Sequence, residues 1–281
     1  MTDPEARAPI RRILVALDAS GASLAALDAA ARLAATLEAE LLGLFVEDID
    51  LLRLAELPFA REVGLTFAQV RRMESADMER ALRAQAARAR QALERVASRV
   101  SVQCTFRVVR GRVTEELLGA ATEVDIVAIG FTSHAIPRAR PGTTATALAT
   151  GAGRTILILP SETAIRPPVM AVYDGSPAAR HALTLAVRLA QAEPWPLLLW
   201  IAGPNAPRRR ALQQEAEQSL EGAGLTATVR DWEDHDLSLL LREVRRYRGG
   251  TLVLPADMAR GERERLTQVL EQAGGAVLLV R

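Results

Sequence analysis

An eight-residue pattern occurs twice in this chain. It reads Ile13-Leu-Val-Ala-Leu-Asp18-Ala-Ser20 near the start and Val169-Met-Ala-Val-Tyr-Asp174-Gly-Ser176 beyond the middle. In each copy an apolar run ends in Asp, a small residue and Ser, and an Ala- and Leu-rich stretch with helical spacing follows. A buried strand that leads into a helix through such a turn is one βα unit, with Ser20 or Ser176 as the N-cap. Because the unit recurs after 156 residues, the sequence predicts two domains of one fold.

Composition supports two folded domains and argues against several functional classes. The chain has 281 residues, about twice the usual domain length, and 49% of them are hydrophobic. The formal net charge is +1, from 35 basic and 34 acidic residues, so no overall field favours nucleic acid or an anionic membrane. Every basic residue is an arginine, which excludes Schiff-base and P-loop lysine chemistry by this chain.

The single cysteine and the hydropathy pattern predict a protein of a reducing compartment. Cys104 cannot form an intrachain disulfide, and its place in an apolar run is more typical of a sheet residue than of a nucleophile. No apolar run reaches the ~18 residues that cross a bilayer, and the N-terminus has no signal-peptide core. We therefore expect a cytoplasmic protein that binds neither membrane nor nucleic acid.

Short β-branched runs alternate with helical patterns in both copies, which is typical of βαβ units around a parallel sheet buried on both faces. The right-handed crossover rule then favours a doubly wound layer. In the first copy we expect strands at Ile13–Leu17, Glu40–Val46, Val100–Val109, Asp125–Ile129 and Thr155–Leu159, and helices at Ser20–Leu37, Ser75–Ser98, Thr114–Thr122 and from Thr143 to about Gly151. In the second we expect strands at Val169–Tyr173, Leu197–Ile201, Leu225–Asp231, Thr251–Leu254 and Ala276–Val280, and helices at Pro177–Ala192, Pro207–Glu221, Leu237–Tyr247 and Gly261–Gln272.

The expected domains are residues 1–160 and 161–281, joined by the short, proline-containing linker Pro160–Pro168. The copies differ most after their second strand, where the first carries the insertion Glu47–Met73. Its leucines and phenylalanines either pack back on the domain as a flap, which we favour, or form a partner-binding or ligand-gating surface.

The pattern resembles the universal stress protein family in its tandem form, over essentially the whole chain from about Ile10. The resemblance rests on Val-Ala-Leu-Asp18-Ala-Ser20, on Val-Tyr-Asp174-Gly-Ser-Pro-Ala-Ala-Arg-His-Ala-Leu183, and on the segment from Asp125-Ile-Val-Ala-Ile-Gly130 to Thr155-Ile-Leu-Ile-Leu-Pro160. It implies an α/β fold: two tandem copies of a doubly wound, five-stranded parallel sheet of the adenine nucleotide alpha hydrolase-like type, packed as a pseudo-twofold pair. Family members pair through the edge strand that ends each domain. We therefore expect the strands 155–159 and 276–280 to pair within one chain, and a homodimer of whole chains stays open.

The family's nucleotide-binding members carry a loop with Gly, two residues, Gly, nine residues, and Gly-Ser or Gly-Thr, and an Asp at the end of the first strand contacts the nucleoside. In this chain Gly130 matches the first position, but Ser133 replaces the second glycine and only eight residues separate it from Gly142. Gly142 still precedes a helix, whose free N–H groups favour an anion, and two loop arginines add positive charge. The resemblance thus implies a weakened ATP-type site at Asp18, Gly130, Ser133, Arg138, Arg140, Gly142, Thr143 and Thr144. The alternative is a loop that is kept for folding after the ligand was lost.

The second copy departs further from the nucleotide-binding pattern. It lacks the glycine pair and has Asp257, Glu262 and Glu264 where phosphate would lie, and these like charges oppose an anion. We expect this domain to be a structural partner without a nucleotide.

Two constellations with catalytic or metal-binding residue types are better explained by local structure, and one further histidine is left open. Asp174, Ser176 and His181 have the residue types of a hydrolase triad, but Ser176 precedes a proline as a helix cap would, and His181 falls inside the helix. The acidic segment 231–236, with one histidine, is more typical of a turn and an N-cap than of a metal site. His134 in the variant loop either contacts phosphate or faces water. We expect no catalytic and no metal-ligating residues.

The function that we expect is that of a regulatory or stress-tolerance protein without a fast catalytic step. It requires no cofactor, and ATP binds weakly, in the first domain only. The alternatives are slow ATP hydrolysis in that domain, and a protein-interaction module with unknown clients that acts through the Glu47–Met73 insertion.

Overall fold

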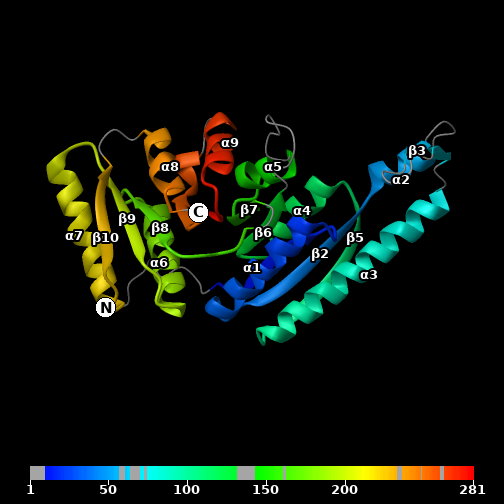
Figure 1. The fold of residues 1–281 in the computed structure, drawn as a ribbon, viewed down its shortest axis with the longest axis horizontal. Helices are drawn as coiled ribbons and strands as arrows, with labels where there is room; N and C mark the ends of the chain where they lie inside the picture. The colour runs from blue at the N-terminus through cyan, green and yellow to red at the C-terminus, as the bar shows by residue number, and fades with distance from the viewer. Residues whose placement is uncertain are drawn as a thin grey trace.

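In the computed structural model, ten strands form one continuous sheet with helices on both faces (Figure 1). The structure describes residues 10–56, 61–63, 70–72, 75–131, 143–160, 163–232, 236–247, 249–259 and 263–281. The strand order across the sheet is β10-β9-β8-β11-β12-β7-β6-β1-β2-β5. All neighbours are parallel except β12 and β7, which are antiparallel.

The first half of the molecule, residues 10–160, contains β1 (Arg12–Leu17), α1 (Gly21–Leu37), β2 (Glu40–Asp48), α2 (Ile49–Glu56), β3 (Arg61–Val63), β4 (Val70–Arg72), α3 (Ser75–Arg99), β5 (Cys104–Gly111), α4 (Val113–Ala121), β6 (Ile126–Phe131), α5 (Thr143–Gly151) and β7 (Thr155–Pro160). The second half, residues 163–281, contains β8 (Val169–Tyr173), α6 (Pro177–Ala192), β9 (Leu197–Ala202), α7 (Ala206–Gly222), β10 (Ala227–Trp232), α8 (Leu237–Arg245), β11 (Thr251–Pro255), the 3-10 helix η1 (Ala256–Ala259), α9 (Arg263–Gln272) and β12 (Val277–Val280).

The sheet separates two hydrophobic cores. One core joins the sheet to α1, α3, α6 and α7, and the other joins it to α4, α5, α8 and α9. Strands β7, β8, β9, β11 and β12 are buried at every residue, as expected for parallel strands covered on both faces. The five sheet strands of each half have the same spatial order. In each half the order reverses between the first and the fourth strand, which are β1 and β6 in the first half and β8 and β11 in the second. Such switch points, at the carboxyl ends of the strands, are where α/β sheets bind ligands.

The expected pairing of the two edge strands is present. In β7 and β12, Leu157 is opposite Leu278 and Ile156 is opposite Leu279. Two arginines of the second half reinforce this junction, one on each face of the sheet. Arg188 of α6 donates to the carbonyl of Leu37 at the end of α1 (3.3 Å), and Arg281 donates to Ala149 (2.7 Å) and Thr150 (3.1 Å) at the end of α5. Positive groups at helix C-termini are favourable because the last carbonyls carry partial negative charge.

The linker is held against the second half rather than left loose. The backbone N–H of Arg166 donates to the hydroxyl of Thr251 (3.0 Å), and that hydroxyl donates to the carbonyl of Arg166 (2.9 Å). Ile165 is buried in the core. These contacts fix the point from which the second half begins.

Two sequence expectations need correction. Strand β5 begins at Cys104, not at Val100, because α3 runs to Arg99 and a turn follows in which Ser101 has a positive φ of 56°. The apolar character of Val100 and Val102 favours a strand in the sequence, but both side chains pack on the core from this turn.

The insertion contains secondary structure that the sequence expectations lack. Residues Ile49–Glu56 form α2, and β3 and β4 form a small antiparallel pair. Together with the start of α3 they project beyond the end of the main sheet (Figure 1). In α2, Leu52 is buried, whereas Leu51 and Leu54 are 42% and 47% exposed. The flap prediction also depended on the segments Leu57–Phe59 and Gly64–Phe67, which lie outside the described residues.

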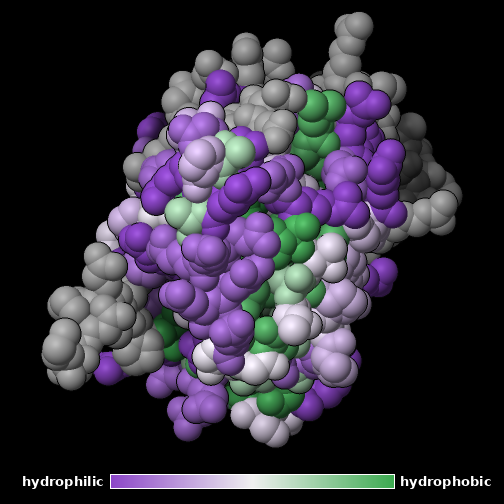
Figure 2. All heavy atoms as spheres, turned by 90° about the vertical axis from the view of Figure 1, so that its left-hand side faces the viewer, coloured by the Kyte–Doolittle hydropathy of each residue, from purple (hydrophilic) through white to green (hydrophobic). Residues whose placement is uncertain are grey.

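The opposite end of the molecule carries α7 and β10. Figure 2 looks at this end: hydrophilic side chains cover most of it, and apolar ones form a narrow strip. In the described part of the chain, no helix combines the length and apolarity needed to cross a lipid bilayer.

Candidate functional site

The turn after β1 holds Asp18 in a defined conformation. A carboxylate oxygen of Asp18, Oδ1, accepts a hydrogen bond from the backbone N–H of Ser20 (2.8 Å). The hydroxyl of Ser20 accepts from the N–H of Ser23 (3.2 Å), which makes Ser20 the N-cap of α1 as expected. The hydroxyl of Ser23 donates to the carbonyl of Ser20 (3.1 Å) and accepts from the N–H of Asp18 (3.4 Å). The turn is therefore closed by its own side chains.

The hydrogen bonds of this turn favour the charged form of Asp18. Partial burial raises the pKa of the Asp18 carboxyl, but the hydrogen bonds from Ser20 and Ser23 outweigh it and leave the pKa below the ordinary value. The second carboxylate oxygen, Oδ2, has no hydrogen-bond partner among the described residues, and the residue is exposed. Asp18 thus presents a charged acceptor at the carboxyl edge of the sheet.

Gly130 lies directly beneath the first turn of α1. A Cβ atom at this position would lie 2.0 Å from the carbonyl oxygen of Ala22 and 3.1 Å from the backbone nitrogen of Ser23. Only glycine allows this close approach of helix and strand. The structure therefore brings Gly130 and the Asp18 turn together through the backbone of α1, and it gives Gly130 a packing role that needs no ligand.

Helix α5 begins at Thr143, as expected. The hydroxyl of Thr144 shares a hydrogen bond with the hydroxyl of Thr114 on α4 (3.2 Å), so this side chain joins two helices. For Thr143, only the backbone is described. Four further predicted site residues lie outside the described residues: Ser133, Arg138, Arg140 and Gly142. Their part in a nucleotide site stays a prediction.

The second half repeats the turn with different neighbours. Oδ1 of Asp174 accepts from the N–H of Ser176 (2.9 Å), and the hydroxyl of Ser176 accepts from the N–H of Ala179 (3.1 Å), so Ser176 is the N-cap of α6 as expected. Between them Gly175 has a positive φ of 78°. The corresponding residue of the first half, Ala19, has a positive φ of 61° although it carries a Cβ.

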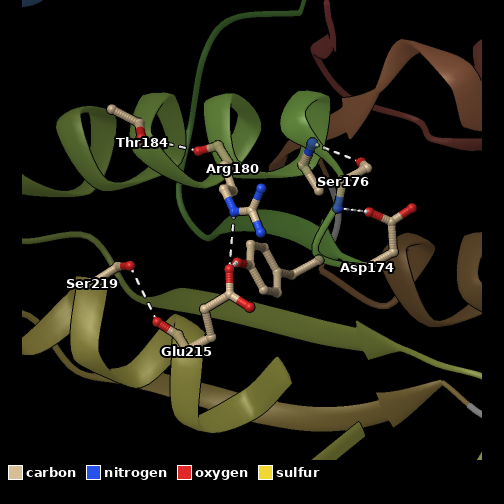
Figure 3. A network of polar contacts seen from close by, with 8 residues as sticks. Asp174, Ser176, Arg180, Thr184, Glu215 and Ser219 are labelled. Carbon is tan, nitrogen blue, oxygen red and sulfur yellow. Dashed lines mark hydrogen bonds and ion pairs between the residues drawn. The ribbon is translucent and has the colours of Figure 1, made fainter. Parts of the chain in front are cut away.

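A polar network beside this second turn was missed by the sequence reasoning (Figure 3). Oε1 of Glu215 on α7 accepts from the hydroxyl of Tyr173 (2.6 Å) and from Nε of Arg180 (2.9 Å). Tyr173 ends β8, and its residue is 1% exposed. The first half has Leu17 and Leu24 at the positions that match Tyr173 and Arg180. The difference between the two leucines and this tyrosine and arginine was the signal in the sequence for a polar network. It did not identify the acidic partner, because Glu215 lies 35 residues beyond Arg180.

The protonation states in this network follow from its hydrogen bonds. Burial, together with the hydrogen bond to Glu215, raises the pKa of the Tyr173 phenol. The hydrogen bond from Tyr173 and the one from Arg180 lower the pKa of Glu215, against the opposing effect of burial. A neutral phenol and a charged guanidinium therefore both donate to a charged carboxylate, which ties β8, α6 and α7 together.

The hydrogen bonds do not match those of a hydrolase triad. The carboxylate of Asp174 and the hydroxyl of Ser176 both accept from backbone N–H groups. Nδ1 of His181 is buried without a hydrogen-bond partner among the described residues. A Ser nucleophile requires a base within hydrogen-bond reach, and no such bond joins Ser176 to His181.

The acidic segment before α8 is a helix start in the part that the structure describes. Oδ1 of Asp236 accepts from the N–H of Ser238 (2.8 Å), which makes Asp236 the N-cap of α8. Glu233, Asp234 and His235 lie outside the described residues. Within the described ranges, no three His, Cys, Asp or Glu side chains are grouped closely enough to hold a metal ion.

Comparison with known proteins agrees with this architecture. A model of the universal stress protein family matches residues 9–160. No curated protein sequence matches the chain significantly. Among solved structures, a universal stress protein from Archaeoglobus fulgidus has a TM-score of 0.70 at 14% identity, over 95% of this chain and 97% of that one.

Two further solved structures resemble the chain. The cytoplasmic domain of a prokaryotic cation chloride cotransporter has a TM-score of 0.53 at 11% identity, over 96% of this chain and 95% of that one. A universal stress protein in complex with cAMP matches over 55% of this chain and 100% of its own length, with 19% identity and a TM-score of 0.39. At such low identities, the Archaeoglobus fulgidus and cotransporter likenesses show the fold that these proteins share.

Proposed function

Because this chain belongs to the universal stress protein family, we propose that it is a tandem stress-response protein whose first half binds an adenine nucleotide. The site lies between the Asp18 turn and the N-terminus of α5. The observation that carries the proposal is the conformation of Asp18: one oxygen is fixed by Ser20, and the other is left to accept a hydrogen bond from a ribose hydroxyl. Its carboxyl group is a charged acceptor at neutral pH, as for an ordinary aspartate, and the hydrogen bonds of the turn lower its pKa further.

The position of α5 supports the same proposal. The helix follows β6, the strand next to β1, so in this proposal its first N–H groups face the switch point of the first half. A helix N-terminus there favours a phosphate. In the second half, β11 leads instead into η1, which carries Asp257 in its first turn, so we propose that this half does not bind nucleotide. We further propose that residues 1–160 and 161–281 are two domains, of which the second is a structural partner.

Thermal unfolding with Mg-ATP tests the proposal. At ~100 times the dissociation constant, a ligand specific for the folded state adds about 2.7 kcal/mol to its stability. The duplicated turn supplies a matched control, because Asp18→Ala and Asp174→Ala each remove one hydrogen bond to the N–H of a capping serine. We expect both variants to lose similar stability, and only Asp18→Ala to lose the gain from Mg-ATP. If millimolar Mg-ATP leaves the melting curve of the unmodified protein unchanged and calorimetry is flat, the first half has no working nucleotide site.

A second candidate, a protein-interaction module, is favoured by α2. Leu51 and Leu54, three residues apart on this helix, are both exposed at the projecting end of the molecule. Exposed apolar pairs of this kind are typical of contact surfaces. If the protein acts through this surface, a Leu51→Ser/Leu54→Ser variant should keep the melting temperature but lose stress tolerance in vivo. ATP should then change the melting temperature of neither the variant nor the unmodified protein.

A further inference from the structure

The main sheet ends in two open edges, β5 in the first half and β10 in the second. Among the described residues, β5 pairs only with β2. Helix α3 lies at the same end of the molecule as β5 (Figure 1). An open edge presents unpaired N–H and C=O groups to other chains unless charged side chains or a covering segment protect it. The two edges differ in this protection.

Strand β10 is the protected edge. It has six residues, two of which are neighbouring charged residues in ion pairs: Arg230 with Glu243 (3.1 Å) and Asp231 with Arg209 (3.4 Å). Figure 2 looks at this end of the molecule and shows mostly hydrophilic side chains. Charged residues on a short edge strand oppose the addition of another strand.

Strand β5 is longer, and an apolar residue near its centre is exposed. It has eight residues, and Val108 is 41% exposed. The N–H of Leu41 in β2 bonds the carbonyl of Gln103 (2.9 Å), so the backbone groups of Gln103 are directed toward β2. Because these groups alternate in direction along a strand, those of Phe106, Val108 and Arg110 are directed to the open edge. They have no hydrogen-bond partner among the described residues.

Helix α3 adds charges beside this edge. The helix contacts both β2 and β5. The guanidinium of Arg90 lies over the ring of Phe106, 5.1 Å from its centroid, and makes no ion pair with another described residue. Nearer the start of α3, Oε1 of Glu79 lies 3.6 Å from Nη1 of Arg110. One face of the edge therefore carries a positive group at one end and a carboxylate at the other.

Antiparallel pairing of β5 with the β5 of a second chain is restricted to few registers. Residues that face each other in such a pair lie on the same face of the sheet, so even numbers pair with even numbers and odd with odd. A register centred on Arg107 puts two arginines opposite each other. One centred on Phe106 brings the two Arg90 guanidiniums together. The register centred on Val108 avoids both repulsions, and registers centred further from the middle pair fewer residues.

We propose that two copies of this chain associate through their β5 edges, in the antiparallel register centred on Val108. Phe106 of one chain then lies opposite Arg110 of the other, and each pair exchanges both N–H···O bonds. Arg90, which lies over that ring, comes beside the Glu79 that accompanies that arginine. The two-fold axis repeats this ion pair. The two α3 helices lie about 10 Å apart, two strand spacings, which is a normal packing distance for helices.

A second copy is the occupant that these charges select, because both members of each new ion pair come from this chain. A two-fold pair also covers the β5 edge of both chains at once, so no further strand can add there. The interface is separate from the nucleotide site proposed above, which lies at β1 and β6 on the other side of β2. The two proposals can therefore be tested independently.

Sedimentation equilibrium of the full chain measures the association. We expect a species with twice the chain mass of 30.3 kDa and a dissociation constant in about the micromolar range. Val108→Arg puts two arginines opposite each other at the axis and should weaken the association at least about tenfold. The control Thr228→Arg adds the same charge to an exposed position of β10 and should leave the association unchanged.

Two charge variants test the register. Arg90→Glu and Glu79→Arg each bring like charges together in a dimer of one variant, so each alone should associate at least about tenfold more weakly than the unmodified protein. A mixed dimer contains two opposite-charge pairs, one of them reversed. An equimolar mixture should therefore form dimers at concentrations where neither variant does so alone. Side chains that only stabilise their own chain would give no such rescue.

A cysteine at the axis gives a direct test of the contact. In a Cys104→Ser background, Val108→Cys puts two cysteines at a hydrogen-bonded antiparallel pair, whose Cα–Cα distance of about 5.5 Å suits a disulfide. With oxidised glutathione we expect a disulfide-linked dimer on a non-reducing gel. Thr228→Cys in the same background is the control and should stay monomeric on that gel.

Three results would overturn the proposal. They are a monomer at about 100 μM, where micromolar association would give mostly dimer, a dimer that Val108→Arg leaves intact, and a mixture of the two charge variants that associates no better than either alone. Cooperative unfolding of each variant establishes that it is folded, so a loss of association is read only from folded protein. None of these outcomes depends on whether ATP binds.

Discussion

The two halves of this molecule contain the same turn in two different surroundings. Asp18 and Asp174 each accept from the N–H of the serine that caps the next helix. In the second half the residue before the Asp is Tyr173, whose hydroxyl donates to Glu215, and the same carboxylate oxygen accepts from Arg180. In the first half it is Leu17, and the turn bears a non-glycine residue in a left-handed conformation. Because the turn forms in both surroundings, the comparison teaches that it is a folding device that does not depend on these neighbours.

The largest effect is expected where strand and helix approach most closely. Gly130→Ala should destabilise the protein by roughly 3 kcal/mol, because the new Cβ would overlap the backbone of Ala22 and force α1 away from β6. Chemical denaturation measures the loss. Gly119→Ala is the control: no atom outside the local backbone of α4 lies within 4 Å of the added Cβ, so the change should stabilise the protein by about 0.5–1 kcal/mol. Equal effects of the two changes would contradict the packing role of Gly130.

Replacing glycine by alanine in one turn and alanine by glycine in the other should change the stability of the protein in opposite directions. Gly175→Ala puts a side chain at a φ of 78° and 2.5 Å from Cδ2 of Leu212, which should cost about 1–2 kcal/mol. Ala19→Gly relieves the same conformation and should gain about 0.5–1 kcal/mol. Both values come from denaturant unfolding of the full chain. A loss of stability on Ala19→Gly would show that the left-handed alanine is not strained.

The helix caps should respond alike in the two halves. Ser20→Ala and Ser176→Ala each remove an acceptor for one N–H in the first turn, so each should cost about 1 kcal/mol. Folded protein should not react with a fluorophosphonate probe, because Ser176 has no adjacent base. Labelling at Ser176 that is lost in Ser176→Ala would establish a nucleophile and refute the cap assignment.

The smallest effect is expected at Glu215, and it should depend on pH. Glu215→Gln weakens the bonds to Tyr173 and Arg180 at a partly exposed site and should cost roughly 0.5–1 kcal/mol. The pKa of Glu215 is lowered from its ordinary 4.5 on folding. Its contribution is therefore complete above pH 4.5 and is lost as the pH falls through the lower folded value.

Denaturation at several pH values tests this prediction. The stability difference between the unmodified protein and Glu215→Gln should be constant at neutral pH and shrink in acid. Glu221→Gln, at the exposed end of the same helix, should show neither the cost nor the pH dependence. A difference that grows in acid would mean that Glu215 is not the stabilising acceptor.

The central strands were predictable because strands that are buried on both faces, such as β7, β8, β9, β11 and β12, are apolar almost throughout. The same criterion failed at Val100 and Val102, where apolar residues pack from a turn. It also gave no sign of α2, in which Leu52 is buried but Leu51 and Leu54 are exposed. Of the candidate site, Asp18 and the start of α5 follow from local patterns. The role of Gly130 does not, because it depends on a helix more than 100 residues earlier in the sequence. Glu215 was missed for the same reason.

The antiparallel pairing of β7 with β12 has a further consequence for assembly. Two separate chains that share a sheet meet at a rate and to an extent that depend on how much protein is present. Here the short segment after β7 keeps the two edges together at a high effective concentration. The shared sheet therefore forms with the same yield in a scarce protein as in an abundant one. In a pair of identical chains, a mutation changes both sides of the junction. Here β7 and β12 are different segments of one chain, so a mutation can change one side without altering the other.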